Sequence, residues 1–165
     1  MTRELTFVYD HGQVYLYDAS AAASVDFLAA LDDSSRTGLS VGLNGALVDL
    51  LMPLQWNFSA PLLLETPEGE PPLDLDDWDH IVEFALQLPS GRLLIEGSGG
   101  SGQSEIELPP DAYRARWAGR RFPPPGDYVP RESSDDAYRL QLWTARSDEP
   151  PRELKLWPGY DVLAG

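Results

Sequence analysis

Seven carboxylates crowd into one short stretch of this chain, where they could hold a cation or attract a basic partner. We call them the acidic patch; its members are Glu68, Glu70, Asp74, Asp76, Asp77, Asp79 and Glu83. No lysine or arginine occurs between Arg36 and Arg92. A surface field of one sign acts on binding partners rather than on the fold. The patch could bind a basic protein or a cation, or the acidic loop at 66–77 could only keep the chain soluble; we expect a basic protein.

Few other residues have the chemistry of an active site or a metal site. Calcium prefers several carboxylate oxygens in a curled loop, but the run from Asp74 to Asp79 lacks the glycine of an EF-type loop, so we predict no metal. The chain has only two histidines, His11 and His80, and no Gly-x-Ser-x-Gly motif accompanies them. Paired carboxylates could also act as acid and base, but carboxylates are too abundant here for that pattern to be a signal. An enzymatic role would need a solvent-open pocket that holds His80 beside carboxylates. We expect no enzymatic activity and no cofactor.

Two tryptophans and an arginine are candidate anchors for a partner. Trp143 is out of phase with the apolar residues of its strand, which predicts that it lies on the surface beside Arg139. Trp and Arg often anchor protein interfaces, so Trp143, Arg139 and Trp117 are candidates. Exposed Trp143 and Trp117 could equally stack on sugar rings, and a carbohydrate- or small-ligand-binding sandwich is the alternative function. Trp143 could also be covered by a sheet, helix or loop.

One cluster of basic residues stands against the acidic patch. It consists of Arg114, Arg116, Arg120 and Arg121, and we expect the acidic loop at 66–77 to neutralise it internally. The chain as a whole has a formal net charge of −15, which would repel DNA phosphates and anionic lipids. These observations argue against binding to nucleic acid or to a membrane.

The composition is that of one globular domain, residues 1–165. Hydrophobic residues make up 42% of the chain, with five Trp, seven Tyr and five Phe, which is unlike a disordered chain. There is no cysteine, no apolar leader segment and no window long enough to span a membrane. We expect a soluble, cytoplasmic protein.

Most segments alternate apolar and polar residues with a period of two, which indicates half-buried strands. Strands are predicted at 5–9, 14–17, 39–43, 46–50, 55–58, 62–65, 78–88, 92–96, 105–108, 113–117, 138–142 and 154–156. Residues 19–32 alone read as a short helix, with Asp18 or Ser20 as its N-cap. Short strands separated by turn residues predict a mainly β protein, an antiparallel β-sandwich or jelly roll with one helix.

The sharpest local signal is the pair Asn44-Gly45 between two apolar runs. Asn-Gly tolerates the positive φ angles of a type I′ turn, which makes the tightest hairpin connection. A two-residue turn at Asn44-Gly45 would pair Leu43 with Ala46 and Val41 with Val48. We therefore predict a hairpin over residues 39–50 in this register.

Four segments resemble a family of uncharacterised bacterial β-sandwich proteins. They are Trp78-Asp-His-Ile-Val-Glu, Leu88-Pro-Ser-Gly-Arg-Leu, Ile106-Glu-Leu-Pro-Pro-Asp-Ala-Tyr-Arg-Ala-Arg-Trp and Tyr138-Arg-Leu-Gln-Leu-Trp. That family is distantly similar to the competence protein J family, which inhibits a DNA-entry nuclease. The shared features include an aromatic-Asp step, here Tyr17-Asp18, and a Leu-Pro…Tyr…Trp strand. The resemblance covers roughly residues 5–18 and 78–145, implies a sandwich, and carries over no catalytic residue.

Together these observations predict a protein-binding domain rather than an enzyme. The resemblance implies an inhibitor or immunity protein that occludes a toxin or nuclease, and the acidic patch would attract the basic groove of that target.

Overall fold

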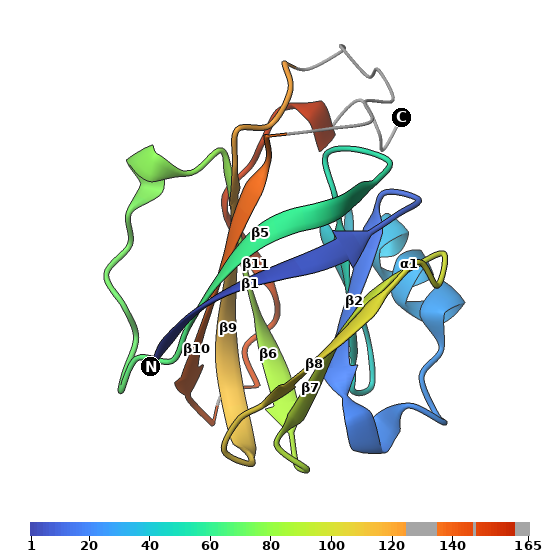
Figure 1. The fold of residues 1–165 in the computed structure, drawn as a ribbon, viewed down its shortest axis with the longest axis vertical. Helices are drawn as coiled ribbons and strands as arrows, with labels where there is room; N and C mark the ends of the chain where they lie inside the picture. The colour runs from blue at the N-terminus through green and yellow to red at the C-terminus, as the bar shows by residue number, and fades with distance from the viewer. Residues whose placement is uncertain (125–134, 147, 161–165) are drawn as a thin grey trace.

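The computed structural model describes residues 1–124, 135–146 and 148–160, and these form two β-sheets packed face to face (Figure 1). The six-stranded sheet has the order β1 (Thr2–Tyr9), β5 (Asn57–Glu65), β10 (Ala137–Thr144), β9 (Asp111–Arg120), β6 (His80–Leu88) and β11 (Arg152–Lys155). The five-stranded sheet has the order β3 (Val41–Asn44), β4 (Leu47–Leu51), β2 (Gln13–Asp18), β7 (Arg92–Gly97) and β8 (Gln103–Glu107). Neighbours are antiparallel except β5 and β10. The predicted β-sandwich is confirmed.

The core lies between the sheets and is built from alternate residues of most strands. Phe7, Leu16, Phe84, Trp117 and Leu140 are all at most 2% exposed and belong to this one cluster. The ring of Trp117 meets Phe7 edge-on at 5.5 Å. Burying such large side chains supplies most of the free energy that holds a sandwich together. Trp117 is therefore a core residue, and the prediction that it anchors a partner or a sugar from the surface is wrong.

The helix begins later than the sequence predicted. Residues Ala19–Ala21 form only a 3-10 turn, η1, whose free amide at Ser20 is capped by the side chain of Asp18. The α-helix, α1, spans Phe27–Thr37, starts after Asp26, which caps the Ala29 amide at 3.0 Å, and ends at Gly38 with φ 73°. The predicted range of 19–32 is thus wrong at both ends, because the Asp26 cap sets the start and a left-handed glycine sets the stop.

Helix α1 lies on the outer face of the five-stranded sheet, over β3 and β4 (Figure 1). Phe27 packs against Tyr15 with ring centroids 4.3 Å apart. The backbones come so close that a Cβ atom at Gly42 would lie 1.8 Å from the carbonyl oxygen of Ala30. No helix among the described residues is long and apolar enough to cross a bilayer.

The hairpin forms where it was predicted, but in a register shifted by two residues. Asn44 pairs with Leu47 and Val41 with Leu50, so the turn residues are Gly45 and Ala46. Gly45 has φ 57°, whereas Ala46 has no positive φ, which excludes the predicted type I′ turn. A shift of two leaves each side chain on its original face, so Val41, Val48 and Leu50 still enter the core. The register predicted from Asn44-Gly45 is therefore wrong.

Candidate functional site

The outer face of the six-stranded sheet carries a buried layer of charged residues. Strand register puts Glu83 of β6 opposite Arg116 of β9, and Arg116 opposite Gln141 of β10. Glu83 is 0% exposed and Arg116 is 2% exposed. Charged side chains on an outward face are normally solvated, so burial here means that another segment covers them.

Glu83 is the centre of this layer. Its Oε1 accepts from Arg116 Nε at 2.9 Å, and its Oε2 accepts from Arg152 Nε at 3.0 Å. Arg114 Nε lies 3.7 Å from Oε2. A buried carboxylate stays ionised only at a high cost unless it is paired in this way. Glu83 is therefore an internal ion-pair partner of three arginines. The prediction that it contacts a partner protein as part of the acidic patch is wrong.

The covering segment is residues 70–78, which we call the strap. Arg116 Nη1 donates to the carbonyl oxygens of Pro71 and Pro72 at 3.0 and 3.1 Å. Arg139 donates two hydrogen bonds of 2.6 Å to the carboxylate of Asp74. On the far side, Lys155 Nζ donates to the Leu75 carbonyl at 2.8 Å. The proline-rich strap is thus fixed along its length, although only Leu75–Asp77 is regular, as the short 3-10 helix η2.

Trp78, the last residue of the strap, packs against arginines of the six-stranded sheet. It is 6% exposed, and its Nε1 donates to Asp74 at 3.2 Å. The guanidinium of Arg139 lies 4.5 Å from its ring centroid, and that of Arg120 lies 5.0 Å away. The hydrogen bonds from Arg139 hold the pKa of Asp74 below its ordinary value. Asp74 is therefore an internal ion-pair partner as well as a member of the acidic patch.

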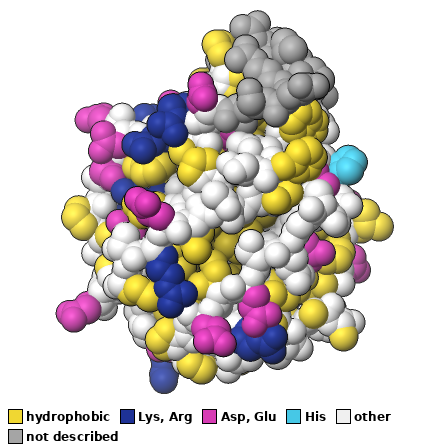
Figure 2. Space-filling model, viewed as in Figure 1, with side chains coloured by type: hydrophobic (Ala, Val, Ile, Leu, Met, Phe, Trp, Pro, Cys, Tyr) yellow, Lys and Arg dark blue, Asp and Glu magenta, His cyan; other side chains and the backbone are white. Residues whose placement is uncertain are grey.

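The remaining carboxylates of the acidic patch differ in how free they are. Glu68, Asp76 and Asp77 are exposed. Glu70 is also exposed, with one oxygen 3.4 Å from Arg116, and half-buried Asp79 accepts from the Phe122 amide at 3.0 Å. Figure 2 shows acidic and basic side chains side by side at the upper left of this face, where the strap lies. Among the described residues no group of three or more His, Asp or Glu could hold a metal ion.

The basic cluster is neutralised in part, but mainly by Glu83 of β6 rather than by the predicted acidic loop at 66–77. Arg114 and Arg116 pair with Glu83, and Arg116 also approaches Glu70. Arg120 and Arg121 make no ion pair with any carboxylate in the described part of the chain. Both line a groove of about 810 Å³ between the end of the strap and strands β1 and β5.

Trp143 is covered, as the alternative prediction had it, and the expected surface exposure is wrong. Trp143 is 5% exposed, and the guanidinium of Arg116 lies 5.3 Å from its ring centroid. Arg139, at 8%, is engaged by Asp74. Because Trp143 and Trp117 are both buried, neither ring is free to stack on a sugar, and the alternative carbohydrate-binding role loses its basis.

The exposed hydrophobic residues are ones that the sequence did not single out. Phe58 is 57% exposed and stacks on Trp56 with centroids 5.3 Å apart. On the strap, Leu73 is 46% exposed and Leu75 is 38% exposed. The members of each pair are two residues apart, but the same spacing occurs on buried strand faces, so it did not mark these residues as exposed.

His80 has a serine within reach but not the arrangement of a catalytic base. It is 2% exposed, and burial lowers its pKa to about 4. Nε2 lies 2.8 Å from Ser40 Oγ, while Nδ1 accepts the Trp157 amide at 3.3 Å. Since Nδ1 must be the unprotonated nitrogen, Nε2 carries the hydrogen and donates it to Ser40. In that tautomer His80 cannot take a proton from the serine.

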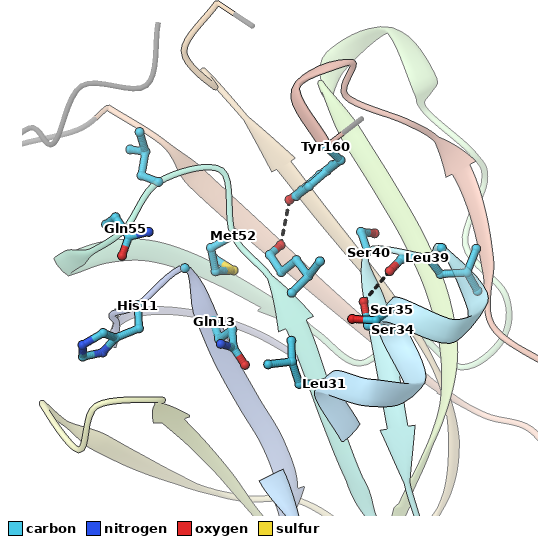
Figure 3. Close-up of a pocket in the computed structure, with 14 residues that line it drawn as sticks. His11, Gln13, Leu31, Ser34, Ser35, Leu39, Ser40, Met52, Gln55 and Tyr160 are labelled. Atoms are coloured by element: carbon cyan, nitrogen blue, oxygen red, sulfur yellow. Dashed lines mark hydrogen bonds between the residues drawn. The ribbon is translucent and has the colours of Figure 1, made fainter. Parts of the chain in front are cut away.

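Ser40 itself lies at the wall of a cavity of about 350 Å³ between α1 and the ends of β2 and β4 (Figure 3). Two polar groups of this cavity are engaged: Ser34 Oγ donates to the Leu39 carbonyl at 2.6 Å, and Tyr160 donates to the Leu51 carbonyl at 2.7 Å. The buried Oε1 of Gln13, by contrast, has no hydrogen-bond partner among the described residues. His80 does not line this cavity. The solvent-open pocket with His80 and carboxylates, which an enzymatic role would need, is not seen there.

Two solved structures have a fold similar to that of this chain. No protein-family model and no curated protein matches the sequence. ComJ from Bacillus subtilis, the inhibitor of the DNA degrading activity of NucA, has a similar structure with a TM-score of 0.57 and 16% identity, over 88% of this chain and 96% of ComJ. The product of crocagin biosynthetic gene J is similar with a TM-score of 0.56 and 17% identity, over 88% of this chain and 98% of that one.

At these identities the likeness concerns the fold alone. The chain has the sandwich seen in ComJ and in the crocagin protein, and the distant resemblance to the competence protein J family in the sequence is confirmed.

Proposed function

We propose that this chain is a protein-binding inhibitor or immunity protein, which occludes a nuclease or toxin with a basic surface. The observation that carries the proposal is the similarity to ComJ, a nuclease inhibitor, along 88% of the chain. The exposed carboxylates Glu68, Glu70, Asp76 and Asp77 support a basic target. They lie on or beside a strap whose backbone is already fixed, so binding would order little of the chain.

The mechanism is steric occlusion with electrostatic steering. A protein that carries −15 repels DNA and attracts the positive groove that a nuclease uses for its substrate. Charges at the rim of an interface act mainly on the association rate. The inhibitor would therefore reach the groove quickly and block it without any chemical step.

The test is binding and inhibition with a nuclease as the probe. The chain is immobilised, a lysate of its source organism is passed over it, and retained nucleases are identified by mass spectrometry and by DNA degradation. Purified NucA serves as a second probe. We expect stoichiometric inhibition, with an association rate that falls roughly tenfold or more as NaCl rises from about 50 to about 500 mM.

Two triple variants separate the strap from general acidity. Glu68→Gln with Asp76→Asn and Asp77→Asn changes the net charge from −15 to −12, since −15 + 3 = −12. Asp32→Asn with Glu105→Gln and Glu107→Gln makes the same change at exposed sites elsewhere. Only the first should slow association substantially. If no nuclease is retained and NucA is unaffected, or if both variants behave alike, the proposal is wrong.

A further inference from the structure

The strap presents two leucines to solvent. Asp74 turns inward to Arg139, with two hydrogen bonds of 2.6 Å. Leu73 lies just before Asp74 and Leu75 begins the 3-10 helix η2 just after it, and neither leucine side chain is buried with Asp74. They are 46% and 38% exposed, and are two of only six large hydrophobic side chains that are exposed in the described part of the chain.

Exposed leucines on a fixed segment are unusual for a surface that only promotes solubility. A solubilising loop gains nothing from apolar groups, which favour association once they are exposed together. Here the flanking prolines are bound through their carbonyls to buried Arg116, and the Leu75 carbonyl is bound to Lys155. The leucines are therefore held in place before any partner arrives, which lowers the entropic cost of using them as contacts.

The order of groups along the strap matches one kind of partner surface. Leu73 and Leu75 are followed by the exposed carboxylates of Asp76 and Asp77, and Glu70 lies just before them. A groove that binds single-stranded nucleic acid combines cations for the phosphates with apolar or aromatic surfaces for the bases. Carboxylates can bind the cations that normally hold the phosphates, and leucine side chains can pack on the surfaces that normally hold the bases.

We propose that the strap imitates a single nucleic-acid strand, with Leu73 and Leu75 inserted where a nuclease stacks bases and Asp76, Asp77 and Glu70 placed where it binds phosphates. This rests on the proposed inhibitory function and names the surface that carries it. Arg116 and Arg139 act as positioning residues, because they hold the strap and turn Asp74 inward. The leucines then determine how long the complex lasts, while the carboxylates determine how fast it forms.

The probe for this inference is the nuclease retained in the experiment above, or NucA if NucA is inhibited. Association and dissociation rates are measured for the native chain, for Leu73→Ala with Leu75→Ala, and for Leu28→Ala. Leu28 is 75% exposed on α1 and serves as the matched control. We expect dissociation of the double variant to be faster by roughly tenfold or more, with little change in association, and Leu28→Ala to resemble the native chain.

Two further measurements guard the interpretation. Leu73→Met with Leu75→Met keeps the apolar volume and should restore slow dissociation, which a merely misplaced strap would not. A single-stranded oligodeoxynucleotide should compete with the native chain for the nuclease. If the native chain binds but the double alanine variant dissociates no faster than Leu28→Ala, or the oligonucleotide does not compete, this inference is wrong while the inhibitory function stands. If the native chain binds neither probe, the proposed function fails with it.

Discussion

Asp49 is the residue whose environment is least favourable to its ordinary charge. It lies on β4, on the face that α1 covers, opposite Tyr15 of β2 and Gly42 of β3. It is 0% exposed, and neither carboxylate oxygen has a hydrogen-bond partner. Burial without a compensating donor disfavours the ionised form and raises the pKa of Asp49 to about 7 from 3.8.

A carboxyl group with a raised folded-state pKa opposes folding wherever the unfolded chain ionises first. The penalty is absent below pH 3.8, grows as the pH rises from 3.8 to about 7, and is constant above that. At roughly 1.4 kcal/mol per pKa unit, Asp49→Asn should gain about 3 kcal/mol of stability relative to the native chain between about pH 4.5 and pH 8. Urea unfolding of both proteins at the two pH values measures this difference.

Asp32→Asn is the matched control for Asp49, because it makes the same change on the exposed side of α1. Its effect on the free energy of unfolding should stay within about 0.5 kcal/mol at both pH values. A gain for Asp49→Asn that is the same at acid and alkaline pH would show that Asp49 is not neutral in the folded protein.

Residue by residue, the sequence predicted inward faces better than outward ones. The period of two marked the apolar residues of the predicted strands as buried, and Phe7, Leu86 and Leu140 do lie in the core. The same rule sent Trp143 and Glu83 to solvent, yet both are buried. The reason is that alternation reports only which face a side chain is on. Whether a distant segment such as the strap covers that face depends on contacts between residues far apart in the chain.

At the contact between α1 and β3 the two backbones are so close that no side-chain atom fits at Gly42. Gly42 has ordinary strand dihedrals, but its missing Cβ is what allows the Ala30 carbonyl to lie against the sheet. Gly42→Ala would place a carbon 1.8 Å from that oxygen, with the Ser34 amide at 3.0 Å, and backbone atoms cannot move aside as a flexible side chain can. Overpacking of this kind costs about 3 kcal/mol, because the helix must lift from the sheet.

The test of this contact is chemical denaturation of Gly42→Ala beside Gly69→Ala. Gly69 has no heavy atom within 4 Å of the added carbon and no positive φ, so its substitution should leave stability nearly unchanged. The near-ultraviolet signal of Tyr15 and Phe27, which pack between helix and sheet, should weaken only for Gly42→Ala. Equal stability of the two variants would mean that α1 is not held against β3.

Element boundaries were predicted less well than element types, and the capping residues explain why. The alanine-rich run at 19–23 has helical propensity, but Asp18 closes a single turn there and Asp26 starts the real helix. In the hairpin, Gly45 takes the first position of the turn rather than the second. Each error came from choosing between two residues that can both cap or turn, eight positions apart at the helix and adjacent in the hairpin, and packing of the whole sandwich decides that choice.

On the scale of the whole molecule, the charged side chains fall into two groups. Some carboxylates are paired with arginine, and others are exposed without such a pair. The chain has 27 acidic and 12 basic residues. Glu83 and Asp74 form internal ion pairs with arginines, and Glu105 forms an ion pair with Arg92 on the surface. The strap carboxylates Asp76 and Asp77 are exposed and add to the negative net charge. Repulsion among the negative side chains disfavours the compact folded state. We therefore expect the fold to be as stable or slightly more stable when these charges are removed.

This self-repulsion gives a prediction that separates binding from folding. The strap variant Glu68→Gln with Asp76→Asn and Asp77→Asn should melt at the same temperature as the native chain or about 1–3 °C higher at low ionic strength, and the gain should shrink in high salt. The matched variant at Asp32, Glu105 and Glu107 should gain less, because it also loses the pair with Arg92. Calorimetry at two salt concentrations measures both. A strap variant that melts several degrees lower would show that these carboxylates support the fold, and slower binding by that variant could then be a folding defect. If it melts no lower, slower binding reports the loss of an electrostatic contact with the partner.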